Sequence, residues 1–198
     1  MTKLTFDMIL DDFFKLVDSI ETPEIKKFVY EGFNMISEDF WMVPTSSSGK
    51  YHPPESNLTP MGLMVHCVKA CTIAKGLFGF FGVTEQIEKD IVIGAILLHD
   101  SYKGGWTDDW DAMIPEHGYI AVSYLAELEL EPEYIKRKLL SAVRVHMSRW
   151  SRPFASVTEF LFPDNMQLIV ALSDMIASLK SFSFYPGLSI LDVDEDES

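Results

Sequence analysis

Residues 96–103 read ILLHDSYK, and the interpretation of the rest of the chain depends on this stretch. From Ile87 to Leu98 the apolar residues recur at helical spacing and then cover nearly the whole surface, which predicts a central helix enclosed on most sides. The helix ends on His99 and Asp100, an imidazole and a carboxylate that can both bind metal ions. Because an isolated His-Asp pair is common at helix ends, the other histidines decide what it means.

The composition predicts one domain and argues against some partners. A chain of 198 residues with 47% hydrophobic content can bury a single sizeable core. A net charge of −14 disfavours a long nucleic acid as partner, because phosphate backbones are held mainly by lysine and arginine. Small anions can still bind in a cleft that carries cations or metals. The chain opens with no basic leader and apolar core, and no apolar run approaches the roughly 20 residues of a membrane span, so a cytoplasmic protein without a membrane partner is expected.

The two cysteines, Cys67 and Cys71, lie one helical turn apart beside His66. A disulfide between them would strain the helix, so both thiols are expected to be reduced. A zinc site that uses the pair is the alternative. The sequence has no second cysteine pair, and buried thiols often serve only to fill a core.

The helical pattern predicts an all-α protein with a single domain over residues 1–185. Residues 1–42 carry two amphipathic helices rich in aromatic residues, which are expected to pack on the core. Residues 43–58 are polar and rich in proline, which indicates a loop. Residues 59–182 are expected to form the metal-binding helical core, and residues 186–198 an acidic, disordered tail.

Helix starts within these regions follow from local signals. Threonine followed by proline occurs at Thr22 and again at Thr59, and each pair predicts the first residues of a helix. Further helices are expected from His117 to about Leu128, from Pro132 onward, and from about residue 166 to residue 182. No stretch alternates in the way a strand requires. In the predicted loop, Lys50, Tyr51 and His52 beside a Ser/Gly run suit either a linker or a substrate-facing segment.

Four of the five histidines and two aspartates fall on separate predicted helices. In chain order they are His66, His99, Asp100, His117, His146 and Asp174. This H, HD, H, H, D order resembles the HD superfamily, the all-helical metal-dependent phosphohydrolases. The resemblance spans roughly residues 51–180 and extends to local motifs: KYHPP ahead of MGLMVH, HDSYK, EHGYIAVSYL and ALSDMIAS.

The chain also departs from the family. Many relatives have a glycine pair before the first histidine and a threonine after it, where this chain has Met61-Gly62 and Cys67. No second histidine follows His146 directly. Pocket detail around the first histidine is therefore not transferred.

The resemblance implies an HD-domain helical bundle with the metal site at its centre. His66, His99, Asp100 and Asp174 would hold the first metal ion, and His117 and His146 the second, with Asp100 bridging both. Imidazole and carboxylate ligands suit iron, manganese, cobalt, nickel or zinc. A hydroxide bridging the two ions would attack phosphorus.

Cations near such a site would offset the charge that develops on the phosphoryl group. Lys103 takes this catalytic and substrate-binding role by its place in the HD-x-x-K motif. Weaker candidates for substrate binding are Arg149, Arg152, Lys69 and Tyr51. Aromatic residues of the flanking loops could stack a base: Tyr51, Tyr102, Trp106, Trp110 and Trp150.

The expected function is hydrolysis of a nucleotide or another small phosphoester. A 3′-to-5′ exonuclease or a cyclic-nucleotide phosphodiesterase is an alternative that the same site could serve. Some proteins of the superfamily with the same six ligands are di-iron oxygenases, and ligand identity does not separate them from hydrolases. A degenerate, noncatalytic binding module is the third class, disfavoured because all six ligand positions are filled.

Overall fold

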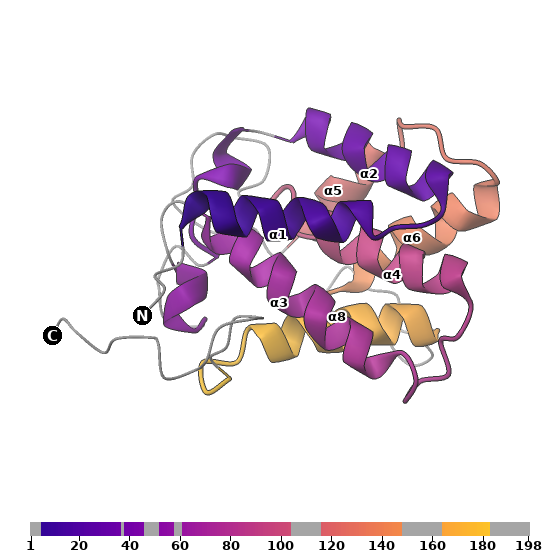
Figure 1. Cartoon of the computed structure of the whole chain (residues 1–198). Helices are drawn as coiled ribbons and strands as arrows, with labels where there is room; N and C mark the ends of the chain where they lie inside the picture. The colour runs from indigo at the N-terminus through magenta and orange to yellow at the C-terminus, as the bar shows by residue number, and fades with distance from the viewer. Residues whose placement is uncertain are drawn as a thin grey trace, which may run out of the picture.

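The computed structural model describes residues 5–36, 38–45, 52–57, 61–103, 116–147 and 164–182. Within these ranges the regular structure is helical and contains no strand, so the all-α prediction is confirmed (Figure 1). The α-helices are α1 (Phe6–Asp18), α2 (Pro23–Met35), α3 (Gly62–Leu77), α4 (Gln86–Leu98), α5 (His117–Leu125), α6 (Glu133–Val145) and α8 (Asn165–Ala177). Two short 3-10 helices, η1 (Glu38–Trp41) and η2 (Pro54–Asn57), lie between α2 and α3.

Helix α4 is the centre of the packing. It contacts α1, α2, α3, α6 and α8, and every residue from Asp90 to Leu98 is buried. Helix α3 runs alongside α8 and is crossed by α1 (Figure 1). The enclosed central helix expected from ILLHDSYK is therefore present, and it delivers residues 99 and 100 to the interior.

The N-terminal helices serve as packing elements. Thr5 caps α1 by accepting a hydrogen bond from the backbone N–H of Met8 at 3.4 Å. Phe13 of α1 is fully buried, and its ring centroid lies 5.3 Å from that of Phe33 of α2. Aromatic contacts of this kind stabilise a core through buried area and edge-to-face geometry. The aromatic density of the N-terminal segment is thus part of the core.

The start of α3 lies at a close approach between two elements. The helix begins at Gly62, after Met61 in the left-handed region at φ 85°. The expected start at the Thr59-Pro60 pair lies outside the described residues. A Cβ atom on Gly62 would lie 2.3 Å from the carbonyl oxygen of Ser56, so the backbones of η2 and α3 approach closely here. Only glycine permits that approach, and a tertiary contact sets the helix start.

Smaller differences concern α5 and the predicted loop. Helix α5 ends at Leu125, one turn before the expected end at Leu128. Part of the predicted loop forms the 3-10 helix η2. The acidic segment 186–198 lies outside the described residues. None of the described helices combines the length and apolarity that crossing a membrane requires.

Candidate metal centre

Two of the histidines stand at equivalent positions, one residue past the end of a helix. His99 follows α4 and His146 follows α6, and both are buried. The Nδ1 atom of His99 lies 2.5 Å from the carbonyl oxygen of Ile96, and that of His146 lies 2.6 Å from the carbonyl oxygen of Val143. Because a carbonyl can only accept, each Nδ1 carries the proton and donates it. Each Nε2 is thereby left for the interior, which is the arrangement found for histidines that bind metals.

The other two histidines come from a helix interior and a helix start. His66 lies on the inner face of α3, and its Nε2 is 2.9 Å from Oδ1 of Asp174 on α8. His117 is the first residue of α5, and its Nε2 is 2.9 Å from Nε2 of His146. Both histidines are fully buried.

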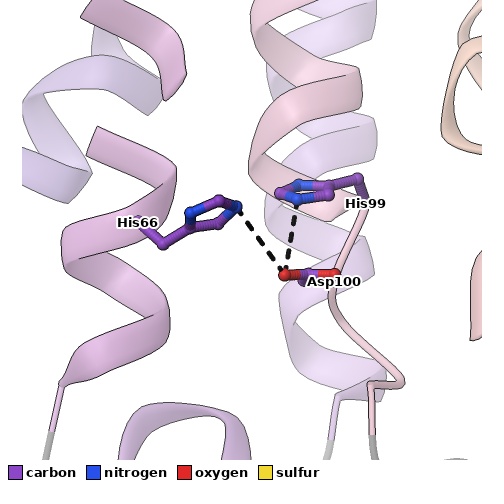
Figure 2. A group of neighbouring side chains, drawn as sticks. All are labelled: His66, His99 and Asp100. Atoms are coloured by element: carbon purple, nitrogen blue, oxygen red, sulfur yellow. Dashed lines mark ion pairs between the residues drawn. The ribbon is translucent and has the colours of Figure 1, made fainter. Parts of the chain in front are cut away.

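Asp100 lies between these histidines and divides its two oxygens among them. Its Oδ2 is 3.4 Å from Nε2 of His99 and 3.9 Å from Nε2 of His66 (Figure 2). Its Oδ1 is 3.0 Å from Nε2 of His117 and 3.7 Å from Nε2 of His146. Each oxygen of this carboxylate therefore faces a different pair of imidazole nitrogens.

The structure brings all six predicted ligand residues together. We call His66, His99, Asp100 and Asp174 the first ligand group, and Asp100, His117 and His146 the second ligand group. Asp174 completes the first group, since its Oδ1 is also 3.6 Å from Nε2 of His99. Three of the residues lie in α3, α5 and α8, and the other three directly follow α4 and α6, so the packing of these five helices determines the site.

The geometry of these atoms fits a metal ion. Two ligand atoms on one ion, each about 2.1 Å from it, lie about 3 Å apart at a right angle and about 3.4 Å apart in a tetrahedron. Distances within the two groups run from 2.9 to 3.9 Å. Nε2 of His99 is buried and has no hydrogen-bond partner among the described residues, although it faces two carboxylates. The buried histidines and aspartates could therefore hold a metal ion.

The electrostatics of the site place its groups in metal-binding protonation states. Burial raises the pKa of a carboxyl group, but the charges of His99 and Lys103 outweigh it and hold the pKa of Asp100 well below its usual value. For Asp174, the hydrogen bond from His66 and the charge of His99 do the same. Burial, together with the charges of neighbouring histidines, lowers the pKa of His146 to about 3. Asp100 and Asp174 are therefore ionised and His146 is neutral, and these are the forms that bind a metal ion.

His99 differs from His146 in its charge. Burial lowers its pKa, but the charges of Asp100 and Asp174 more than offset this effect and hold the pKa well above its usual value. Without a metal, the proton on His99 is one of the positive charges that balance the two carboxylates. A metal ion at the same place would supply that charge and displace the proton.

Lys103 is the cation placed at this centre. It is buried, and its Nζ lies 2.5 Å from Oδ2 of Asp100. Tyr102, a predicted stacking residue, is engaged in packing: its ring is stacked on Tyr124 with centroids 4.3 Å apart, and its hydroxyl donates to the carbonyl of Met35 at 2.9 Å. The same loop that starts with HD therefore turns its lysine toward the carboxylate and its tyrosine toward the core.

Lys69, a candidate for substrate binding, is held elsewhere. Its side chain is fully buried, with Nζ 2.6 Å from a carboxylate oxygen of Glu55 and 3.2 Å from the carbonyl oxygen of Phe182. Burial lowers its pKa despite the opposing effect of Glu55. A phosphate would have to compete with this ion pair. The remaining candidates lie outside the described residues: Tyr51, Arg149, Arg152, Trp106, Trp110 and Trp150.

Both cysteines carry free thiols, as expected. Cys67 directly follows His66, and burial raises the pKa of its thiol, so it is a neutral thiol beside the site. Neither cysteine belongs to a group of candidate ligand atoms among the described residues. The alternative of a zinc site on the cysteine pair has no support from the described geometry.

Sequence reasoning left one residue of this centre without a role. His52, in the KYHPP motif, is 7% exposed, and its ring meets the ring of His66 edge-on with centroids 5.3 Å apart. Burial and the charge of His66 lower its pKa to about 3. The sequence placed His52 in a loop that suited either a linker or a substrate-facing segment, and no spacing rule linked it to the other histidines.

Comparison of the chain with protein-family models, with curated proteins and with solved structures found no match. The resemblance to the HD superfamily therefore depends on the motifs and their spacing, and the site is interpreted from its own geometry.

Proposed function

We propose that the chain is a metal-dependent phosphohydrolase of the HD type that cleaves a nucleotide or another small phosphoester. The proposal depends above all on the position of Asp100, whose Oδ2 faces His66 and His99 while its Oδ1 faces His117 and His146. A carboxylate between two groups of imidazoles can bridge two cations. Paired cations are a recurrent basis of phosphoester hydrolysis.

In this proposal the first ligand group holds one divalent ion and the second ligand group holds another. The donor set suits iron, manganese, cobalt, nickel or zinc, because it combines imidazole with carboxylate and lacks thiolate. When bound, such ions polarise a phosphoryl oxygen and make water a nucleophile near neutral pH. The paired ligand groups make two ions a better fit than one.

The residues of the chain then have separate tasks. The carbonyls of Ile96 and Val143 fix the rings of His99 and His146, so that both Nε2 atoms stay directed at the ions. Lys103 places an ammonium beside the shared carboxylate, where it can offset negative charge that develops on the phosphoryl oxygens. Since the lysine is buried, its charge is screened little by solvent.

The charge of the chain favours a small substrate. A net charge of −14 repels a long polyanion, whereas one phosphoryl group needs only the cations within the site. A nucleotide or a comparable phosphoester is therefore our first candidate. Exonuclease and cyclic-nucleotide phosphodiesterase activities remain alternatives at the same centre.

The proposal is tested by removing and restoring the metal. We expect chelated protein to lose phosphatase activity and to regain it when loaded separately with manganese, iron, cobalt, nickel or zinc. The panel of substrates contains nucleoside mono-, di- and triphosphates, cyclic nucleotides and short oligonucleotides, and the readout is phosphate or nucleoside release. Metal stoichiometry, measured on the same samples, should approach two ions per chain.

Two outcomes would contradict the proposal. Turnover that survives complete chelation would show that the ligand groups are not the reaction centre. Turnover that occurs only with iron and consumes dioxygen, without phosphate release, would favour a di-iron oxygenase. The iron-loaded protein is therefore assayed both in air and without oxygen.

A further inference from the structure

Four of the five histidines of the chain belong to the ligand groups, and His52 is the remaining one. It lies against the first ligand group without belonging to it. It is 7% exposed, and its ring meets that of His66 edge-on. Its nitrogens belong to neither ligand group, nor to any other cluster of candidate ligand atoms among the described residues. His52 therefore stands one layer outside the ligands, where it would reach a molecule bound at the centre more readily than the ions themselves.

The segment that carries His52 is anchored to α3. Asn57 donates from its side-chain amide to the carbonyl oxygen of His52 at 3.0 Å, which closes η2 on the histidine. Glu55 of η2 forms a buried ion pair with Lys69 of α3, with 2.6 Å between Nζ and Oε1. Lys69 lies three residues after His66, so this pair and the ring contact attach η2 to the same stretch of helix. The position of His52 is therefore built into the fold.

One nitrogen of the His52 ring, the buried Nδ1, has no hydrogen-bond partner among the residues that the structure describes. Its contact with the ring of His66 places the imidazole beside the metal centre, where the charges of Lys103, Asp100 and Asp174 act on it. Both carboxylates are already engaged with other histidines. A buried imidazole N–H near an ammonium suits an anionic acceptor, since such an acceptor would satisfy both donors.

We propose that His52 binds the phosphoryl group of the substrate, donating its Nδ1–H to a nonbridging oxygen while Lys103 offsets the negative charge. This inference rests on the proposed function, because it assumes that a phosphorylated molecule occupies the centre. It assigns His52 to substrate binding, as distinct from metal binding or packing.

The experiment uses inorganic phosphate as the probe and zinc-loaded protein, because zinc is diamagnetic. Phosphate affinity is measured by calorimetry for the wild type, His52→Leu, His52→Asn and His52→Gln. The amide nitrogen of asparagine can take the place of Nδ1, whereas that of glutamine lies nearer the position of Nε2. We expect His52→Leu to weaken phosphate binding about tenfold or more and His52→Asn to restore much of the loss. His52→Gln should restore less, and metal stoichiometry should stay unchanged in all three.

Two further measurements keep the inference falsifiable if a variant folds poorly. In the wild type, phosphate should shift the 15N resonance of His52 Nδ1, and the absence of a shift would overturn the assignment. Equal phosphate affinity in the wild type and in folded His52→Leu would overturn it as well. Loss of metal in both His52→Leu and His52→Asn would make the residue a metal ligand or a support of the ligands.

The proposed function can fail separately from this inference. If no phosphoester is turned over, phosphate binding and the Nδ1 resonance still report on His52. If turnover occurs, His52→Leu should raise KM about tenfold and change kcat less, because a binding contact is lost. An unchanged KM would reject the role of His52 and leave the hydrolase proposal intact.

Discussion

At its N-terminal end α4 buries Asp90, and directly past its C-terminal end the chain buries Asp100, so the two ends of one helix each enclose a carboxylate. The relative exposures are 2% and 1%, and exposure alone does not distinguish the two residues. Their partners do.

Asp90 is surrounded by donors of fixed protonation state. Its Oδ2 accepts from the backbone N–H of Glu21 at 3.1 Å, the backbone N–H of Thr22 at 2.8 Å and the hydroxyl of Thr22 at 2.7 Å. Its Oδ1 accepts from the side-chain amide of Gln86 at 2.8 Å. These contacts join the start of α2 to α4 and satisfy N–H groups that the start of a helix leaves free.

Asp100 is instead surrounded by imidazole nitrogens and an ammonium. Imidazoles can exchange a proton for a metal ion, whereas backbone N–H groups cannot. The groups that a buried carboxylate faces therefore determine whether it stabilises the fold or takes part in chemistry. The same substitution at both ends of α4 tests this.

The largest effect is expected from Asp100→Asn. The amide removes a charge and can no longer bridge both ligand groups, so metal should be lost and kcat/KM should fall by about a thousandfold or more. Metal stoichiometry and phosphate release measure the two effects. Full metal content with activity within about tenfold of wild type would remove the basis for treating this end of α4 as the reaction centre.

The matched change at the other end, Asp90→Asn, should act on stability. It puts an amide N–H₂ where a carboxylate accepts from several buried donors, and we expect about 3 kcal/mol less free energy of unfolding. Urea denaturation measures this, while metal stoichiometry and kcat should stay at wild-type values. A loss of metal in this variant would mean that the two ends of α4 are not independent.

The contrast also shows how far the sequence could be interpreted. The spacing of apolar residues predicted the helices, and the order of histidines and aspartates predicted which residues the structure brings together, because each ligand lies at a helix end or on an inner helical face. Asp90 gave no such signal. Three of its four donors, two of them backbone N–H groups, belong to residues 21 and 22, nearly seventy positions away, and backbone groups have no sequence signature.

Residues near η2 show the same limit. The helix start at Gly62 depends on the close approach to Ser56, and the burial of Lys69 depends on Glu55, which lies in a segment that reads as a loop. Each is a contact between elements that local propensity cannot anticipate. The position of His52 could not be predicted either, because it depends on a contact with the ring of His66, which lies in another element.

Lowering the pH should reduce the stability of the metal-free protein in a defined range, through the buried histidines around Asp100. A His146 pKa lowered to about 3 means that the unfolded chain, near 6.5, binds a proton that the folded metal-free protein does not. Stability is then lost as the pH falls below 6.5, by about 2 kcal/mol between pH 6.5 and 5 for this residue. The raised pKa of His99 acts above pH 6.5 and the lowered pKa of Asp100 acts below about 4, so neither contributes in this window. The lowered pKa values of His52 and His66 act in the same window with the same sign.

Urea denaturation of chelated protein across this range checks the sign. His146→Asn should reduce the loss of stability between pH 6.5 and 5 by about 2 kcal/mol, because the variant has one fewer group that takes up a proton on unfolding. His52 and His66, whose pKa values are also lowered, account for the dependence that is left. If wild type and variant lose stability in parallel, His146 is not held neutral by its surroundings.

The smallest effect is expected at the lysines of the two ends. Lys103→Met keeps the length of the side chain but removes the ammonium 2.5 Å from Asp100, and we expect kcat to fall about tenfold with metal retained. Lys89→Met, next to Asp90 at the opposite end of the helix, is the control and should leave kcat unchanged. In Lys103→Met the metal ions still neutralise Asp100, so metal content should not change. Loss of the ammonium should instead leave the negative charge that develops on the phosphoryl group less well stabilised. Loss of metal in Lys103→Met would give the lysine a supporting role for the ligands, and equal kcat values in the two variants would remove it from the chemistry.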